Sequence, residues 1–468
     1  MGNQNSVNGN QNSIAGSWNG VQGNLNGVAG NSNIVKGDSN SVWGNQNGVA
    51  GSWNDIQGNQ NGVFGNANLV NGNQNGVNGN QNAIQGSINS VSGNQNTLIG
   101  NQNLVQGNQN VLAGNQNAVG GSWNSIQGSS NGVVGNQNLI SGNANGVIGN
   151  QNAIGGSFNQ VQGNSNGILG NQNIVGGNVN SVVGNSNYLQ GSNNGIMGNS
   201  NGVLGNQNLV NGNYNAVAGN QNLLQGNQNV IGGNSNAVLG SQNIIQGNTN
   251  GVAGNKNFLS GSFNDIQGNS NGILGNENIV RGNENAIGGN KNFAQGSSNT
   301  IVGNSNGILG NANEIKGSFN AVAGNSNGIG GNWNSVQGSQ NGIMGDKNTI
   351  AGDFNSIWGS SNFVGGSVNT VDGNANGILG NKNVVQGNQN AVIGSGNLVG
   401  GNVNSINGNI NAVSGDWNSI WGSANAIIGD ANGIDGNFNT VQGDKNSISG
   451  SSNFVMGGNN VVISSHGY

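Results

Sequence analysis

The chain has 468 residues, of which 94 are glycine, and it contains no proline and no cysteine. Charged residues make up 4% and hydrophobic residues 32%, against about 25% and 45–50% in an ordinary soluble domain. A net charge of −5, with no charged side chain between Asp55 and Lys256, excludes electrostatic steering of nucleic acid or of an acidic substrate, and the lack of cysteine excludes disulfides and thiol chemistry.

A seven-residue repeat fills the chain. Glycine recurs every seven residues from Gly2 to Gly457, which makes 66 heptads without an insertion or deletion. Numbered from this glycine, position two is mostly Asn, with Ser or Asp as the usual substitutes, and position four is Asn in every heptad. Position six is Val, Ile or Leu except at Ala294. The composition alone would indicate disorder, but a disordered chain needs no register, so the period favours a folded repeat.

Each heptad is predicted to form one short strand and one turn. Constant residues at positions four and six, with variable residues at three, five and seven, give the alternation of a strand with one constant face. A coiled coil would need two apolar positions per heptad, and this repeat has one, which is mostly β-branched. Glycine at position one, followed by Asn, Ser or Asp, supplies the corner. Pairs such as Asn61-Gly62 are typical of hairpin turns, but their phase places them in the strand.

Because one such strand cannot bury its aliphatic side chain alone, we expect the strands to stack as a β-solenoid. The position-four amides would then be buried, and each would bond the amide of the next rung, as in the ladders of amyloid-like cross-β structures. The lack of proline agrees with this, since every backbone N–H belongs to a rung. Examples are Asn61, Asn68 and Asn75 for the Asn ladder, and Val63, Val70 and Val77 for the aliphatic core.

The simplest closure takes two heptads per coil. The fold class is then all-β, a two-sided β-roll whose 66 heptads form 33 coils, with a length on the order of 150 Å at about 4.8 Å per rung. Three heptads per coil stay possible, whereas an antiparallel meander would lose the stacking of like on like. We expect one continuous repeat domain over residues 2–463 with uncapped ends, followed by a tail at 464–468. Open rungs are templates for strand addition and predict head-to-tail polymerisation.

A known family has a similar repeat. Read with glycine last, the unit x-x-N-x-V-x-G resembles the repeat of grass ice-recrystallisation-inhibition and antifreeze proteins over essentially the whole chain, and it is similar to the repeats of Gly-Asn-rich microbial β-solenoids. The resemblance implies a two-sided roll with valine and asparagine inside and, in the plant members, binding to ice. The outward positions here mix Gln, Ala, Leu, Lys and Trp, and threonine is scarce, which departs from the small, Thr-rich surfaces typical of ice binding.

A second, 35-residue period places large apolar residues at position three. Duplication of a 35-residue block explains the period, and aromatic residues exposed in register also indicate lateral association. Five heptads are an odd number, so a two-sided roll would present this feature on its two faces in turn. The candidate assembly contacts are Trp18, Trp53, Trp123, Phe158, Phe263, Trp333 and Phe438.

No catalytic, cofactor-binding or metal-binding residue is predicted, and we expect a protein that is not an enzyme and needs no cofactor. His466 lies in the tail, and the Asp residues at position two, such as Asp38 and Asp353, are interpreted as turn formers. A P-loop and the calcium-binding G-G-x-G-x-D repeat are both missing from the sequence. Residues 1–6 match the N-myristoylation pattern, but Gly2 and Ser6 also fit the repeat.

The favoured functional hypothesis is a structural protein that assembles with itself, head to tail and laterally, into filaments, a sheath or a coat. The alternative is an ice-binding protein with ice as its partner, and a passive spacer is a third possibility. No run of residues is apolar for long enough to span a membrane, and no leader is expected. The location is left open between an extracellular or cell-surface filament and a cytoplasmic assembly.

Overall fold

The chain divides into two compact units, Met1–Ser235 and Asn236–Tyr468, and the computed structural model describes residues 2–464 of it. The secondary structure of these residues consists of 66 strands, each formed by positions five to seven of one heptad. β1 is Ser6–Asn8, β2 is Ser13–Ala15, and each later strand begins seven residues after the one before it, up to β66 at Val461–Ile463. The predicted all-β class is confirmed.

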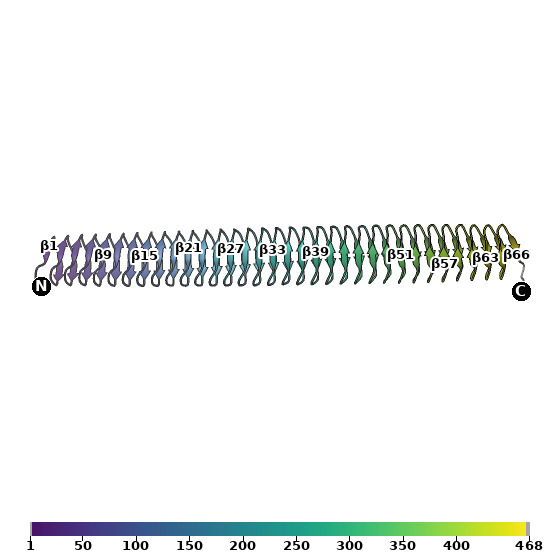
Figure 1. Cartoon of the computed structure of the whole chain (residues 1–468). Helices are drawn as coiled ribbons and strands as arrows, with labels where there is room; N and C mark the ends of the chain where they lie inside the picture. Colours follow the sequence, from purple (N-terminus) through teal and green to yellow (C-terminus); the bar gives the residue numbers. More distant parts are fainter. Residues whose placement is uncertain (1, 465–468) are drawn as a thin grey trace. The chain divides into compact units, whose positions relative to one another are not determined.

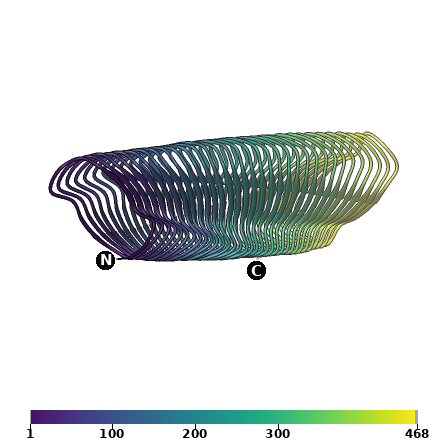
Figure 2. The same ribbon diagram turned by 90° about the vertical axis from the view of Figure 1, so that its left-hand side faces the viewer.

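Within each unit, every strand pairs in parallel with the strand two places further along the chain (Figure 1). For example, β9 (Gly62–Phe64) pairs with β11 (Gly76–Asn78), and Val63 lies opposite Val77. β10 (Leu69–Asn71) pairs in the same way with β12 (Ala83–Gln85). Odd and even strands therefore form two separate sheets, and the coils of each unit follow one another as flattened loops (Figure 2). The prediction of two heptads per coil is confirmed, and three heptads or an antiparallel meander is excluded.

The aliphatic side chains of position six fill the space between the two sheets of each unit. Val63 and Val70 are fully buried, and Val77 is 3% exposed. Along the chain these side chains stack on their equivalents two heptads away, so each core column runs along the unit. Burying one such side chain stabilises the fold by about 1.5–3 kcal/mol, and the repetition adds this contribution once per heptad.

Asn68 illustrates how the buried amides of position four are satisfied. Its Nδ2 donates to Oδ1 of Asn54 at 3.0 Å and to the carbonyl oxygen of Gly79 at 2.8 Å. Its Oδ1 accepts from the backbone N and from Nδ2 of Asn82, both at 3.0 Å. Among residues 2–464, the only buried side-chain polar atom without a partner is Oγ of Ser464. The predicted Asn ladder is confirmed, and it also bonds the backbone, which the sequence argument did not anticipate.

The turn is longer, and the strand shorter, than the alternation of the sequence predicts. Position three lies in the turn with a left-handed backbone, as at Ala67 with φ 59° and Trp53 with φ 63°. Position one needs glycine for two reasons. Gly65 has φ 128°, and a Cβ there would collide with the carbonyl oxygen of Gly79 in the next coil. Successive turns therefore stack backbone on backbone, and positions one to four are all used to reverse the chain.

Candidate binding surfaces

The sheets of each unit present straight columns of outward side chains. In a strand such as β10, the central Val70 is buried while Leu69 and Asn71 at positions five and seven are exposed. Because all strand pairs keep the same register, offset by two heptads, equivalent outward positions lie directly above one another, about 4.8 Å apart. Each sheet thus offers two parallel columns of side chains on a regular backbone.

The candidate assembly contacts lie on the edges of the roll and not on its sheets. All seven are exposed, with fractions of 60–72%. Trp18 lies in the turn that leads into β3 (Gly20–Gln22), and Trp53 lies in the turn that leads into β8 (Asp55–Gln57). The first turn enters an odd strand and the second an even strand, so these turns are on opposite edges. The expected alternation between faces is corrected to an alternation between edges, because position three belongs to the turn.

One pair of edge aromatics is in direct contact. Phe319 and Trp333 occupy position three in successive coils of the second unit, and their ring centroids lie 4.3 Å apart with an interplanar angle of 8°. The sequence argument selected Trp333 and missed Phe319, since Phe319 is out of phase with the 35-residue period. Its place two heptads before Trp333 is the signal that identifies the stack. Any role of these aromatics in assembly stays a prediction.

A second ladder runs along the turns at position two. The backbone N of Asn66 donates to Oδ1 of Asn80 at 2.8 Å. Where Asp38 occupies this position, its Oδ1 accepts from the N of Asn24 at 2.6 Å, and Oγ of Ser87 serves in the same way. Asn, Asp and Ser all carry a side-chain acceptor at this short reach. This ladder explains, better than turn preference alone, why position two is one of these three residue types in every heptad except the last, where it is Gly458.

Ionisable groups in residues 2–464 form two exposed ion pairs. The Nζ of Lys316 lies 2.7 Å from Oε1 of Glu314, and the Nζ of Lys291 lies 3.8 Å from Oε2 of Glu277. The hydrogen bond and charge of Lys316 lower the pKa of Glu314, and Glu314 raises the pKa of Lys316 for the same reasons. These pairs are on the outer surface and resemble no catalytic arrangement.

The described residues also contain no cluster of three or more acidic or histidine side chains that could hold a metal ion. The predicted tail residue His466 lies outside the described residues. Along residues 2–464, helices that are long and apolar enough to cross a membrane are absent.

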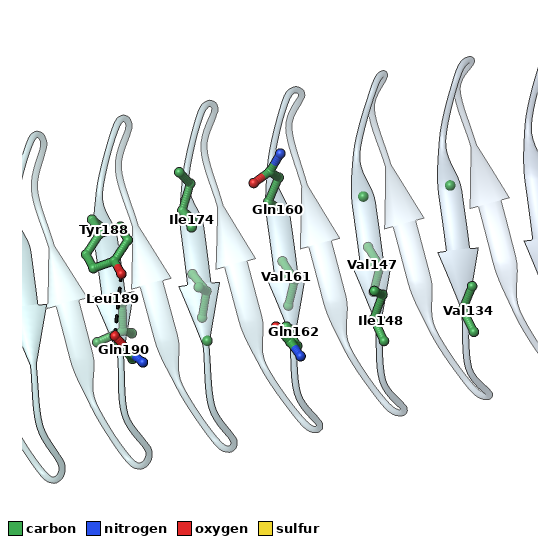
Figure 3. Close-up of a pocket in the computed structure, with 14 residues that line it drawn as sticks. Val134, Val147, Ile148, Gln160, Val161, Gln162, Ile174, Tyr188, Leu189 and Gln190 are labelled. Carbon is green, nitrogen blue, oxygen red and sulfur yellow. Dashed lines mark hydrogen bonds between the residues drawn. The ribbon is translucent and has the colours of Figure 1, made fainter.

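A shallow groove of about 580 Å³ crosses the odd-strand sheet of the first unit (Figure 3). Five successive strands of this sheet line it, and their outward residues form its walls: β19 (Gly132–Val134), β21 (Gly146–Ile148), β23 (Gln160–Gln162), β25 (Ile174–Gly176) and β27 (Tyr188–Gln190). The Oη of Tyr188 donates to Oε1 of Gln190 at 3.4 Å along one wall. The lining is mostly apolar with a few amides, which suits contact with another surface more than chemistry on a small substrate.

These features define a two-sided β-roll with inner and outer amide ladders and repeating, mostly uncharged surfaces. Comparison with known protein families matches the grass antifreeze beta roll over residues 1–72, 26–112, 63–149, 99–191, 134–218, 183–268, 264–352 and 330–422. These overlapping segments cover far more than half of the chain, so the chain belongs to this family, as the resemblance predicted. It is not an enzyme family. A comparison with curated proteins finds no match.

Proposed function

We propose that this protein binds ice through the regular sheets of its β-roll. Membership of the antifreeze beta-roll family carries the proposal. The geometry supports it, because the outward side chains repeat at every coil with a fixed register. A crystal surface is itself periodic, so a periodic protein surface can make the same weak contact many times, and the contacts add when they are held in one rigid body.

Rigidity and low charge favour this mode of binding. Every rung is tied by backbone bonds and by the inner amide ladder, so little conformational entropy is lost when the surface meets ice. The first unit has no charged side chain from residue 56 to its end. From residue 56 onward the sheets of this unit therefore present hydroxyl, amide, apolar and bare backbone groups, which do not hold the strong hydration shells of ions.

Single lysine substitutions test the proposal and locate the surface. Ala118→Lys lies on the odd-strand sheet in β17 (Ala118–Gly120), and Ala153→Lys lies on the even-strand sheet in β22 (Ala153–Gly155). The matched control is Ala144→Lys, which lies in a turn at position three of its heptad. Lysine is tolerated at this position in another heptad, where Lys256 has φ 58°. We expect the unmodified protein to inhibit ice recrystallisation, one sheet variant to lose most of this activity, and the turn variant to keep it. Absence of inhibition by the unmodified protein at micromolar concentration would contradict ice binding.

Assembly into filaments is the second candidate function, and exposed edge aromatics favour it. Trp53 is 72% exposed and Phe438 is 69% exposed, whereas large aromatic groups usually gain stability from burial. Negative-stain electron microscopy of the purified protein tests this candidate. Filaments that disappear in a Trp53→Ser, Trp123→Ser variant would support edge contacts, and separate particles for the unmodified protein would argue against assembly.

A further inference from the structure

Some glycines at position five are required neither by their backbone conformation nor by a close contact with another described residue. Gly132, Gly146 and Gly202 lie in strands on the odd-strand sheet of the first unit, outside the left-handed backbone region. A Cβ added to any of them would meet no described heavy atom within 4 Å. These positions contrast with Gly65, where both φ and the next coil demand glycine. Neither backbone strain nor packing within the chain explains their lack of a side chain.

Glycine within a strand carries a penalty that needs a reason. It destabilises a strand by roughly 0.5–1 kcal/mol relative to alanine, and it often marks a place where a ligand or another chain approaches closely. Since no described atom of the chain approaches these glycines, a second molecule is the candidate for the approaching group.

The glycines on this sheet are matched with large apolar residues on the same strands. Six strands of the odd-strand sheet in the first unit have glycine at one outward position and a large apolar residue at the other. They are β9, β19, β21, β25, β29 (Gly202–Leu204) and β33 (Val230–Gly232).

The even-strand sheet of the first unit has only two such strands, β24 (Gly167–Leu169) and β28 (Gly195–Met197). In β28 the space is already taken within the chain, because a Cβ on Gly195 would lie 2.9 Å from Cδ1 of Leu209. The pattern is therefore more frequent on the odd-strand sheet of the first unit, with six strands against two.

The order of large and small residues reverses along the groove. In β19 and β21 glycine is at position five and the large residue at position seven, whereas β25 has Ile174 at position five and Gly176 at position seven. A partner that fits this sheet must carry the opposite order at each of the same coils.

We propose that the odd-strand sheet of the first unit packs face to face on the same sheet of a second copy, with the coil axes parallel and the coils in register. A twofold axis along the coil direction places position five of each strand opposite position seven of the equivalent strand. Gly146 then faces Ile148 of the second copy, and Ile174 faces Gly176 of the second copy. Each large side chain enters the gap over a glycine, and close packing across the interface results.

A second copy fits this surface better than ice does. An ice surface repeats identically at every step, so it cannot complement glycine at position five in β21 and glycine at position seven in β25 equally well. A rotated copy of the same sheet carries the opposite order of large and small residues at each strand. The only charged residue on this sheet in the first unit is Lys36, so like charges do little to oppose the pairing. The inference deepens the assembly candidate by naming its surface and partner, and it leaves the even-strand sheet free for ice.

The test uses substitutions that change the size of outward side chains on the sheet and leave the buried residues of the coil unchanged. Gly146→Ile would put isoleucine opposite isoleucine across the interface. The double variant Gly146→Ile, Ile148→Gly exchanges the two residues and restores one large side chain per gap. Gly167→Ile is the matched control on the even-strand sheet, where a Cβ also meets nothing within 4 Å. Far-ultraviolet circular dichroism checks that all three variants keep the β-solenoid.

Sedimentation velocity over a micromolar concentration series provides the readout. We expect the unmodified protein and Gly167→Ile to dimerise alike, Gly146→Ile to raise the dimer dissociation constant by at least about tenfold, equivalent to about 1.4 kcal/mol, and the exchange variant to recover dimerisation. A monomeric unmodified protein would overturn the proposal. So would an exchange variant that does not recover, or an equal loss in Gly167→Ile.

Electron microscopy of the same samples separates this inference from assembly in general. Filaments that persist unchanged in Gly146→Ile would show assembly through another surface, so the face-to-face contact would be wrong while the assembly candidate survived. Ice recrystallisation measured on these samples reports independently on the first proposed function.

Discussion

At the scale of single residues, position four is invariant because one side chain must fill two acceptor and two donor roles in a dry site. The amide of Asn68 donates to Asn54 and Gly79 and accepts twice from Asn82. Serine has one donor, and ionised aspartate has none. Glutamine has the right chemistry, but its extra methylene would not fit the fixed distance between the strand and the next turn.

Replacing Asn68 with alanine should destabilise the coils around it. The substitution removes the partner of the carbonyl oxygen of Gly79 and of two donors of Asn82, its backbone N–H and one N–H of its amide. One unsatisfied buried polar group costs about 1–3 kcal/mol. Hydrogen exchange measured by mass spectrometry should show a local opening free energy lower by about 2–3 kcal/mol over residues 54–82. The control Asn66→Ser retains an acceptor at the exposed outer ladder and should exchange like the unmodified protein. Equal protection in both variants would contradict the role of the inner ladder.

Two glycines three residues apart should respond in opposite ways to alanine. Gly65→Ala introduces a side chain at φ 128° and into the carbonyl oxygen of Gly79, so we expect a loss of several degrees or more in melting temperature. Gly62→Ala fills open space in a strand and should be neutral or stabilise the fold by roughly 0.5–1 kcal/mol. Thermal melts followed by circular dichroism compare the two variants. A similar loss in both would show that the backbone at Gly62 is also constrained.

At the scale of the element, the heptad builds the strand and the pair of heptads builds the coil. A three-residue strand such as β10 (Leu69–Asn71) is too short to be stable alone. It pairs with its neighbours β8 and β12, to which it is related by a shift of two heptads, and it buries Val70 between the two sheets. All heptads carry the same inner residues, so any heptad can serve in either sheet. What distinguishes the two sheets is only the set of outward residues.

Deletions that respect the heptad should therefore be tolerated, and others should not. Removing one coil, residues 72–85, keeps each later strand in its own sheet. Removing one heptad, residues 72–78, keeps the inner residues in phase but moves each later strand to the opposite sheet. We expect both variants to melt close to the unmodified protein. Removing residues 73–75 breaks the phase and should abolish protection from hydrogen exchange near the deletion. Poor folding of the one-heptad variant alone would show that the two sheets are not interchangeable.

At the scale of the whole molecule, neutral hydrogen bonds and aliphatic burial hold the fold, and charge contributes little. The chain has 13 acidic and 8 basic residues in 468, and the two ion pairs among the described residues, Lys316 with Glu314 and Lys291 with Glu277, lie on the surface. The side chains of Lys316 and Glu314 are both exposed. The same scarcity of charge leaves amide, hydroxyl and apolar groups to determine what the surfaces contact.

Stability should consequently be nearly independent of pH between about pH 5.5 and 9. The lowered pKa of Glu314 contributes stability above its ordinary value of 4.5 that is lost as the pH falls through the lowered value. The raised pKa of Lys316 contributes below its ordinary value of 10.5 and is lost as the pH rises past that value. Both contributions are complete within this window. Melting temperatures across it should agree closely, and a marked slope would contradict the small contribution of charge to the stability of the fold.

The sequence by itself left two and three heptads per coil open, and only the pairing of each strand with the strand two places further along decided for two. It did determine the repeat, the all-β class and the burial of positions four and six, because each follows from a period that only stacked strands can satisfy. Asn61 and Val63 could be placed inside on this ground alone. Only the tertiary structure decided that position three lies in a left-handed turn, that Trp53 is on an edge, and that position two forms an outer ladder. Those features depend on how successive turns stack, and the distance between turns is not encoded in the alternation of one strand. The same holds for the reversed order of glycine and large residue in Gly146–Ile148 and Ile174–Gly176. The two strands lie on one surface only because the odd strands pair into one sheet.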